Sequence, residues 1–343
     1  MKKIVALLFA FILVSGCQDA PPEIDYNELD RKANDELIAE ANKYFQPLPL
    51  HQYQYDRSEI AQQIHLGKIL YYDPRLSKYG TYSCNSCHNL STSGVDNKAT
   101  IASHSEAEIA RNVPTVLNAI INNVSSWDGS FEATGNDDEL AIPHADILSK
   151  KIEEIPEYQK LFAEAFPLQD TPLTLNNLEK SIVAFERTLI TPSGFDKFLE
   201  GNAFAISYEA RAGLKLFIQT GCTDCHSGSA LGGTMVRKFG EAHDYHPLTG
   251  SSHKDEGLKN RTGNLKDKDK FKVAGLRNIG RTYPYFHDGS VEYLSTAVKI
   301  MAKTQLDKDL DDEQIRLIVT FLNALSGDVP EDAQKAPLSL ASY

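Results

Sequence analysis

The sequence predicts an all-α protein built from two small helical domains. Apolar residues recur at helical spacing through most of the 343 residues, and no segment shows the convincing alternation expected of a half-buried strand. A Cys-x-x-Cys-His motif occurs once in each half, and in both halves a predicted helix precedes it. We therefore expect one helical unit to be repeated, with the junction near residue 190.

The helices are expected where apolar residues fall on one stripe and turn residues follow. Ile60, Ile64 and Tyr71 share such a stripe, and Asp73-Pro74 ends it. Pro114 can open a helix, because proline is tolerated in the first turn. The break at Thr191-Pro192-Ser193-Gly194 separates the two halves. The expected helices span 26–45, 58–72, 114–121, 146–166, 175–190, 207–217, 291–301 and 311–325, and the charged segment 251–270 is expected to be an exposed loop.

The two motifs are Cys84-Asn85-Ser86-Cys87-His88 and Cys222-Thr223-Asp224-Cys225-His226. This pattern is the attachment site of c-type haem, in which both thiols bond to haem vinyl groups and the histidine binds the iron. The motifs contain four of the five cysteines, so thiol usage is almost wholly haem attachment. We expect two cytochrome c-like domains, each with one covalently bound haem, and haems that face each other across the domain interface.

A zinc site, a thioredoxin-like pair and two disulfides fit the motifs less well than haem does. A zinc site built from two Cys-x-x-Cys pairs usually has about 15–20 residues between the pairs, whereas more than a hundred residues separate them here. A thioredoxin-like pair would account for one motif, but not for two that are each followed by histidine. Two disulfides would fit the composition, although a three-residue spacing makes a tight, strained ring.

The first residues predict export. Lys2 and Lys3 precede an apolar run at 4–14, which is too short to span a membrane and is typical of a signal peptide. Small residues then precede Cys17, an arrangement similar to a bacterial lipobox, in which the cysteine becomes the lipidated first residue. The alternative is cleavage by ordinary signal peptidase, with Cys17 merely nearby. Gln18 favours the outer membrane, and haem attachment through thioethers belongs to the periplasm. The expected parts are a signal peptide at 1–16, a tether at 17–25, domains at 26–190 and 191–330, and a tail at 331–343.

The charge of the chain restricts its partners. The formal net charge is −12, and removal of the signal peptide with Lys2 and Lys3 leaves −14. A surface of this sign disfavours nucleic acid and favours a basic partner. No second long apolar run occurs, so we expect the lipid to be the only attachment to a membrane. The sequence does not fix the oligomeric state, and a homodimer is kept as one option.

Each haem iron has a second face, opposite its histidine, whose ligand must be assigned. Methionine at this position raises the potential of a haem. Beyond Met1 the chain has only Met235, in a Gly-rich loop, and Met301, on an expected helix. The spacing favours Met301. The first half contains no such methionine, so a histidine or an open position is expected there, and the candidates are His51, His65, His104 and His144.

Several further segments match one known pattern. They are 66–77 (LGKILYYDPRLS), 94–96 (GVD), 111–118 (RNVPTVLN), 127–129 (WDG), Gly221 before the second haem motif, 276–278 (LRN), 284–290 (PYFHDGS), and Gln305-Leu306 after Met301. Together with the two haem motifs, they make the sequence similar to the bacterial dihaem cytochrome c peroxidases, whose superfamily also contains the MauG-type enzymes. The resemblance covers most of the chain after the signal peptide.

The resemblance implies roles for individual residues. His104 matches the distal histidine that caps the low-potential, peroxide-reactive haem of the first half, although Ser103 precedes it where glycine is usual. Met301 matches the axial methionine of the high-potential haem, where a MauG-type enzyme has tyrosine. Trp127 matches the aromatic residue between the haems, which is an electron relay. The resemblance also implies an interdomain calcium site of oxygen ligands, and the matching residues are Asn112, Thr282 and Pro284.

The segment after Trp127 is shorter than its counterpart in the family, which contains the glutamate that serves as acid–base catalyst. Residues 130–141 (SFEATGNDDELA) supply the candidates. Glu139 matches the catalytic glutamate best, and Glu132 is the other candidate acid. The alternative is that residues 137–139 form a solvated acidic loop. His144 is expected at the surface.

The resemblance implies an enzyme that reduces hydrogen peroxide to water with two electrons from a small donor, a basic cytochrome or a copper protein. Peroxide would bind at the first-half haem, and a carboxylate such as Glu139 would move a proton between the peroxide oxygens. Trp127 would pass the second electron from the Met301 haem. Two alternatives stay open. A dihaem electron carrier would keep both irons six-coordinate, and a MauG-like oxidase would modify a protein side chain, against which Met301 argues.

Overall fold

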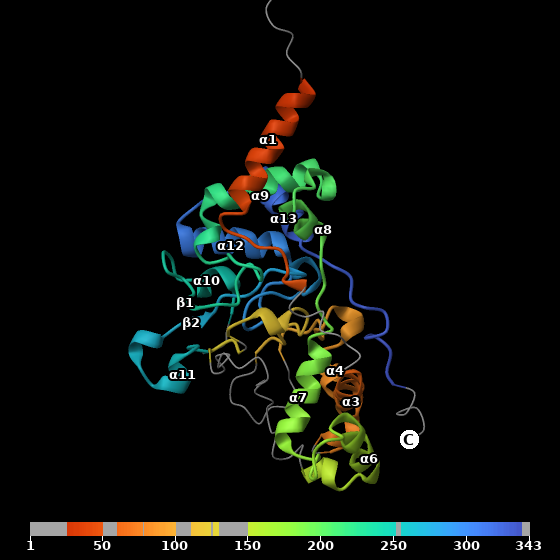
Figure 1. Cartoon of the computed structure of the whole chain (residues 1–343). Helices are drawn as coiled ribbons and strands as arrows, with labels where there is room; N and C mark the ends of the chain where they lie inside the picture. The colour runs from red at the N-terminus through yellow and green to blue at the C-terminus, as the bar shows by residue number, and fades with distance from the viewer. Residues whose placement is uncertain are drawn as a thin grey trace, which may run out of the picture.

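The computed structural model describes residues 26–50, 60–77, 79–100, 111–124, 126–129, 150–251 and 255–337. Within these ranges the chain is mostly helical, with one two-stranded sheet. Figure 1 shows two groups of helices, with α3, α6 and α7 at the bottom, α9, α12 and α13 at the top, and loop-rich segments between them. The prediction of a helix-rich fold is confirmed. None of the helices in these ranges is both long and apolar enough to cross a membrane.

The N-terminal group of helices is held together by apolar side chains. α3 (Ala61–Tyr72) packs against α6 (Pro156–Ala165) and α7 (Leu175–Glu186). The side chain of Thr174 accepts a hydrogen bond from the backbone of Asn177 and so caps α7. α4 (Cys84–Cys87) is the single turn that contains the first haem motif. The core consists of Leu66, Ile69, Leu70, Leu76, Ile152, Tyr158, Phe162, Ala165, Phe166, Leu178 and Ile182.

The C-terminal group is formed by α8 (Gly194–Leu199), α9 (Tyr208–Thr220), α12 (Leu294–Leu306) and α13 (Asp312–Asn323). Ser193, Ser207 and Asp311 cap the first turns of α8, α9 and α13. Gly221, with a φ of +95°, ends α9 directly before the second haem motif. Single-turn helices lie at α10 (His246–Thr249) and α11 (Lys259–Thr262). The described 3₁₀ turns are Pro74–Leu76, Leu90–Thr92, Ala119–Ile121, Ala203–Ala205, Cys222–Asp224, Leu265–Asp267 and Ile279–Arg281.

The same close helix crossing occurs in both groups. Gly67 of α3 lies against Ser181 of α7, and Gly213 of α9 lies against Leu317 of α13. A Cβ atom at either glycine would overlap the backbone carbonyl oxygen of its neighbour, so only glycine permits these approaches. The aromatic pairs one turn further on are Tyr71–Phe185 and Phe217–Phe321, with ring centroids 5.2 and 5.4 Å apart. Each glycine-bearing helix precedes a haem motif, as the expected repeat requires.

The two ends of the described chain pack on the opposite groups of helices. α1 (Tyr26–Ala41) lies in the predicted domain 26–190, yet Ile38, Ala41 and Phe45 are buried in the C-terminal core, because they meet its aromatic cluster. Ala333 of the C-terminal tail packs in the opposite direction: it is buried in the N-terminal part, where its carbonyl accepts a hydrogen bond from the hydroxyl of Tyr72 at 2.8 Å. The N-terminal helix and the tail therefore cross the boundary drawn from the sequence.

The structure corrects several predicted elements. β1 (Val236–Lys238) and β2 (Lys270–Lys272) pair antiparallel, although the sequence shows no alternating strand. The segment 251–270 is not simply an exposed loop, because it contains α11 and the buried Asp255. Only the end of the expected helix 114–121 is helical, and residues 111–116 form no regular element. α6 covers part of the expected helix 146–166, of which 150–153 are also helical.

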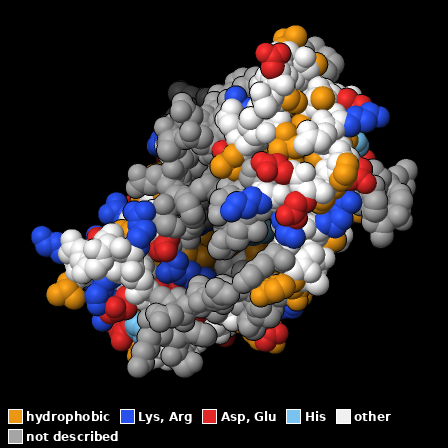
Figure 2. Space-filling model, turned by 90° about the horizontal axis from the view of Figure 1, so that it is seen from below, with side chains coloured by type: hydrophobic (Ala, Val, Ile, Leu, Met, Phe, Trp, Pro, Cys, Tyr) orange, Lys and Arg blue, Asp and Glu red, His pale blue; other side chains and the backbone are white. Residues whose placement is uncertain are grey.

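Charged side chains of both signs share one face of the molecule. Seen from below, Lys and Arg side chains are interspersed with Asp and Glu side chains among the described residues (Figure 2). Opposite charges also pair within single helices: on α6 the ammonium of Lys160 lies 3.6 Å from the carboxylate of Glu164, one turn further along. Part of the negative charge of the chain is therefore balanced locally.

Thr191 connects the two halves at the predicted junction. Its side chain is fully buried, and its hydroxyl oxygen accepts hydrogen bonds from the side-chain amides of Asn118 and Asn278, each at 2.8 Å. Both asparagines have a positive φ, 57° and 61°, which asparagine tolerates better than most residues. Each is followed by a 3₁₀ turn. Corresponding positions of the two repeats therefore meet at one buried threonine.

Candidate active site

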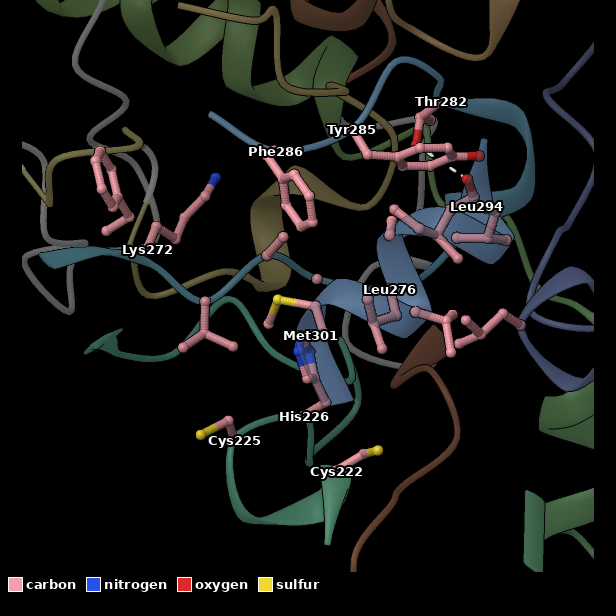
Figure 3. A pocket seen from close by; sticks show the side chains of 18 of the residues that line it. Cys222, Cys225, His226, Lys272, Leu276, Thr282, Tyr285, Phe286, Leu294 and Met301 are labelled. Atoms are coloured by element: carbon pink, nitrogen blue, oxygen red, sulfur yellow. Dashed lines mark hydrogen bonds between the residues drawn. The ribbon is translucent and has the colours of Figure 1, made fainter. Parts of the chain in front are cut away.

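A cavity of about 260 Å³ lies between the C-terminal helices and the N-terminal segment 112–115. Figure 3 shows Cys222, Cys225 and His226 together, with Met301 of α12 beside His226. Much of the lining is apolar, which suits the macrocycle of a haem. The apolar side chains of the lining include Phe217, Leu276, Tyr285, Phe286, Leu294 and Leu322.

His226 is held in the form that can bind a metal. Its Nδ1 lies 3.1 Å from the carbonyl oxygen of Leu231, so Nδ1 carries the proton and Nε2 keeps its lone pair. Burial lowers the pKa of His226, even though the carbonyls of Leu231 and Ala274 oppose this change. The ring is therefore neutral, and neutral imidazole is the metal-binding form of histidine.

His88 has the same arrangement in the N-terminal half. Its Nδ1 lies 3.0 Å from the carbonyl oxygen of Pro114, and burial lowers its pKa. The hydroxyl of Tyr71 donates to the backbone carbonyl of His88 and fixes the peptide that follows the haem motif. Both histidines thus have one ring nitrogen committed to a backbone carbonyl, as is usual for histidines that bind metals.

The cysteines behave as apolar groups beside these histidines. Burial raises the pKa of Cys84 and of Cys222 to about 12, so both thiols stay protonated. Cys84 packs against an apolar cluster that includes Tyr71 and Phe185. Within the described residues, no group of three or more His, Cys, Asp or Glu side chains is arranged to hold a metal ion, so a zinc site gains no support there. The donor set at each motif fits a covalently attached haem.

The structure places the two candidate methionines differently. Met301 lines the cavity together with His226. The sulfur of Met235 instead accepts a hydrogen bond from the side chain of Arg237 at 3.4 Å, and Met235 is not part of the cavity wall. Among the histidine candidates of the first half, His65 is exposed on α3. His51, His104 and His144 lie outside the described residues.

Trp127 lies at the interface and is held at both ends. Its Nε1 donates to the carbonyl oxygen of Asn112 at 2.9 Å, and its own carbonyl accepts from the backbone of Lys272 at 2.7 Å. The side chain also lines the cavity that contains His226 and Met301. Trp127 therefore contacts both halves of the protein.

Asn112, Thr282 and Pro284, the residues matched to a calcium site, all line the cavity. The side-chain amide of Asn112 donates to the carbonyl of Lys98 at 2.9 Å, and its backbone donates to the carbonyl of His287 at 2.7 Å. Amide and carbonyl oxygens of this kind are ligands that calcium accepts.

Sequence reasoning missed an ion cluster next to Trp127. The side chain of Arg111 donates to Asp128 at 2.7 Å and to the two carboxylate oxygens of Asp255 at 2.7 and 3.0 Å. Asp255 also accepts from Asn260 at 2.7 Å. Arg111 and Asp128 lie in the matched segments 111–118 and 127–129, but the sequence gives no sign that they pair. The other partner, Asp255, lies far along the chain, in a segment predicted to be an exposed loop.

Sequence reasoning also missed two buried ionisable side chains. Glu186, at the end of α7, is 7% exposed, and burial raises its pKa to about 8. Burial is the main cause of the raised pKa of Cys84, and the nearby carboxylate of Glu186 is the second cause. Lys272, on β2, is 8% exposed, and burial lowers its pKa to about 8. Nothing in the local sequence distinguishes either residue from a surface charge.

Several predicted residues cannot be placed in this site. Glu139, Glu132, His104 and the lipidation candidate Cys17 all lie outside the described residues. Their roles remain predictions from the sequence.

Comparison with known proteins identifies the family. Residues 61–204 match the family described as di-haem cytochrome c peroxidase. The chain is 40% identical over 282 residues to cytochrome c551 peroxidase of Nitrosomonas europaea, covering 80% of this chain and 82% of the relative. The chain belongs to the dihaem cytochrome c peroxidase family. It is also 38% identical to cytochrome c551 peroxidase of Pseudomonas aeruginosa, over 86% of this chain and 88% of that relative. Identity to the methylamine utilization protein MauG of Methylorubrum extorquens is lower, 29% over 69% of this chain and 67% of the relative.

Solved structures share the fold of this peroxidase family member. A MauG-like protein associated with microbial copper homeostasis superposes with a TM-score of 0.67 at 23% identity, covering 81% of this chain and 93% of that chain. A variant of the diheme peroxidase BthA from Burkholderia thailandensis superposes with a TM-score of 0.61 at 17% identity, covering 80% and 90%. At these identities the likeness supports the fold alone.

Proposed function

We propose that this protein reduces hydrogen peroxide to two molecules of water, taking two electrons from a small donor and two protons from solvent. The observation that carries the proposal is the pair of Cys-x-x-Cys-His sites, each with a neutral histidine held through Nδ1, in a chain 40% identical to a cytochrome c551 peroxidase. The donor would be a small cytochrome c or a copper protein. The formal net charge of −12 disfavours nucleic acid as a partner.

Two c-type haems would be the resident cofactors, each supplying an iron that changes its oxidation state by one electron. Cys84, Cys87 and His88 would hold the N-terminal haem. Cys222, Cys225, His226 and Met301 would hold the C-terminal haem, and the placing of Met301 beside His226 supports this assignment. We infer that the two haems face each other across the interface where Trp127 lies, so that Trp127 relays the electron.

The remaining steps belong to groups in the N-terminal half. His104 would cap the N-terminal iron at rest and leave when the C-terminal haem is reduced, which opens the site to peroxide. Glu139 would take the proton from the peroxide oxygen bound at the site and return it to the distal oxygen, so that water leaves as the O–O bond breaks. Methionine rather than tyrosine at position 301 favours this reaction over a MauG-like oxidation of a protein side chain.

A calcium ion would stabilise the interface. Asn112, Thr282 and Pro284 come from both halves and line the same cavity, which supports an interdomain site of oxygen ligands. Such an ion would fix the segment whose carbonyl groups hold Trp127 and His88. Removal of calcium with a chelator should therefore slow electron transfer between the haems, and added calcium should restore it.

The protein would act in the periplasm, held to the outer membrane by lipid on Cys17. A Cys17→Ala variant should release the mature protein into the soluble fraction, whereas retention in the membrane fraction would contradict lipidation. The domains would be 26–190 and 191–330, with α1 packed across that boundary. A homodimer remains the option to test by light scattering of the purified holoprotein.

Paired variants test the proton chemistry. Glu139→Gln should leave both haem spectra unchanged and slow peroxide reduction roughly 10²–10⁴-fold, the usual worth of a positioned acid or base. Glu132→Gln is the matched control and should turn over normally. If instead Glu132→Gln is inactive and Glu139→Gln is active, the match through the shortened segment is wrong. If both variants turn over normally, the proposed proton transfer does not occur in this protein.

A further inference from the structure

The side chain of Lys272 lies over the indole ring of Trp127. Its ammonium nitrogen is 5.6 Å from the ring centroid, and the backbone nitrogen of Lys272 donates to the carbonyl of Trp127 at 2.7 Å. Both side chains line the cavity that contains His226 and Met301, and Figure 3 shows Lys272 in that view. Lys272 is only 8% exposed. The cation and the ring therefore form a buried pair at the interface.

The backbone around the pair is fixed on both sides. Lys272 stands opposite Val236 in the β1–β2 sheet, and a Cβ at Gly129, two residues after Trp127, would lie 2.7 Å from a methyl carbon of Val236. Asp128, next to Trp127, is bound to Arg111. The strand and the turn at 126–129 are thus locked together, and the ammonium is held over the ring by the fold itself.

A cation in this position opposes oxidation of the indole. A positive charge over the face of an aromatic ring is attracted by its π electrons. Removal of one electron would turn the ring into a radical cation and the attraction into repulsion, which is strong where water is largely excluded. Burial lowers the pKa of Lys272 to about 8, so the ammonium form still predominates at pH 7.

The hydrogen bond from Nε1 of Trp127 to Asn112 also opposes oxidation of the indole. An oxidised indole can lose its positive charge if Nε1 releases its proton to a base. Here Nε1 donates to the amide carbonyl of Asn112, and an amide oxygen is too weak a base to take that proton. The radical cation would keep its charge beside Lys272.

We propose that Lys272 is a positioning residue that acts through Trp127 and prevents it from storing an oxidising equivalent. The indole then conducts one electron from the C-terminal to the N-terminal haem site and is itself left unchanged. This inference rests on the proposed peroxidase function. It explains how a tryptophan between two such sites can serve as a relay without becoming a site of protein oxidation.

The test uses the fact that Trp127 is the only tryptophan of the chain. Half-reduced holoprotein, carrying ring-deuterated tryptophan, is mixed at pH 7 with an excess of peroxide, so that oxidising equivalents exceed the one stored electron. Samples are frozen at intervals, and the tryptophan radical is counted by EPR, with deuteration identifying it. Lys272→Met keeps an unbranched side chain that is one atom shorter and removes its charge. We expect it to give at least about tenfold more tryptophan radical than wild type, since a desolvated cation–π pair is lost.

Two further variants serve as controls. Lys270→Met removes a charge from the same strand at a more exposed position, where Lys270 pairs with Asp267, and should behave as wild type. Lys272→Arg keeps a cation over the ring and should restore the low radical yield. Haem content and far-UV circular dichroism establish that each variant is folded. If Lys272→Met does not fold, Lys272→Gln provides a second variant with a neutral side chain.

Two results would overturn the inference. One is an equal radical yield in Lys272→Met and wild type while the haem absorption responds to peroxide in both. Another is an abundant radical already in wild type. If the equal yield is accompanied by a lower potential of the C-terminal haem in Lys272→Met, Lys272 serves the haem instead. If the haem absorption of wild type does not respond to peroxide at all, the proposed function itself fails, and the inference fails with it.

Discussion

The indole nitrogen of Trp127 lies 2.9 Å from the carbonyl oxygen of Asn112. Two residues further on, the carbonyl oxygen of Pro114 lies 3.0 Å from Nδ1 of His88. The short segment 112–114 therefore has a hydrogen bond at each end, one to the aromatic residue of the interface and one to the histidine of the first haem motif. This segment offers the most direct connection between Trp127 and the N-terminal haem site among the described contacts.

The first prediction concerns this connection. Trp127→Phe keeps an aromatic ring but removes the Nε1 donor, so electron transfer between the haems should become slower while the absorption spectrum and potential of each haem stay unchanged. Transient absorption after rapid reduction of the C-terminal haem measures the rate. An unchanged rate would show that the electron takes another route.

The second prediction concerns the ligand of the C-terminal iron. Met301→His replaces a thioether that favours ferrous iron, so the reduction potential of the C-terminal haem should fall. Met235→Leu is the matched control, because Met235 lies outside the cavity wall, and its potential should equal that of wild type. Spectroelectrochemical titration measures both. The opposite pattern would assign the ligand to Met235.

The helices were largely predictable because their apolar stripes and end signals are local. The C-terminal packing of α1 was not, since a stripe shows that a face is buried but not which partner covers it. The same limit applies to Asp255, whose partner Arg111 is distant in the chain. The short β1–β2 pair was missed because three-residue strands give almost no alternation.

The third prediction concerns the repeated helix crossing. Gly213→Ala would place a methyl group against the carbonyl oxygen of Leu317, so α9 and α13 must separate. We expect the free energy of unfolding to fall by about 1–3 kcal/mol, the usual cost of overpacking a core. Lys215→Ala, at an exposed position of the same helix, should change it little. Urea denaturation of the two holoproteins makes the comparison, and equal stabilities would contradict the close crossing.

The fourth prediction concerns the pH dependence of stability. Because burial raises the pKa of Glu186 to about 8, above its ordinary value, the native state binds a proton that the unfolded state has already lost. The contribution of Glu186 is therefore greatest at low pH and is lost as pH rises through about 8. Between the ordinary pKa of a glutamate and about 8, this group lowers the free energy of unfolding by up to about 1.4 kcal/mol per pH unit.

Glu186→Gln should remove this component, so that the variant becomes more stable relative to wild type as pH rises from about 5 to 8. Glu200→Gln, at an exposed position, is the control and should keep the wild-type dependence. Urea denaturation at a series of pH values gives the difference. A constant difference between Glu186→Gln and wild type across this range would contradict the raised pKa.

The haem ligands could be predicted from the sequence, whereas the buried charged residues around them could not. The two motifs identify their own chemistry, because thiol and histidine spacing is fixed by the haem itself. The cavity position of Met301 also follows the predicted helix. Lys272 and Glu186 carry no such signal, since a buried charge differs from a surface charge only through distant residues that cover it.

One measurement tests the central claim most directly. The holoprotein is titrated to the half-reduced state while absorption and EPR spectra are recorded, and hydrogen peroxide is then added. The peroxidase account predicts that reduction of the C-terminal haem makes the N-terminal haem high-spin, and that each peroxide consumed takes up two electrons. Two haems that both stay low-spin, with peroxide left unconsumed, would contradict that account and identify the protein as an electron carrier.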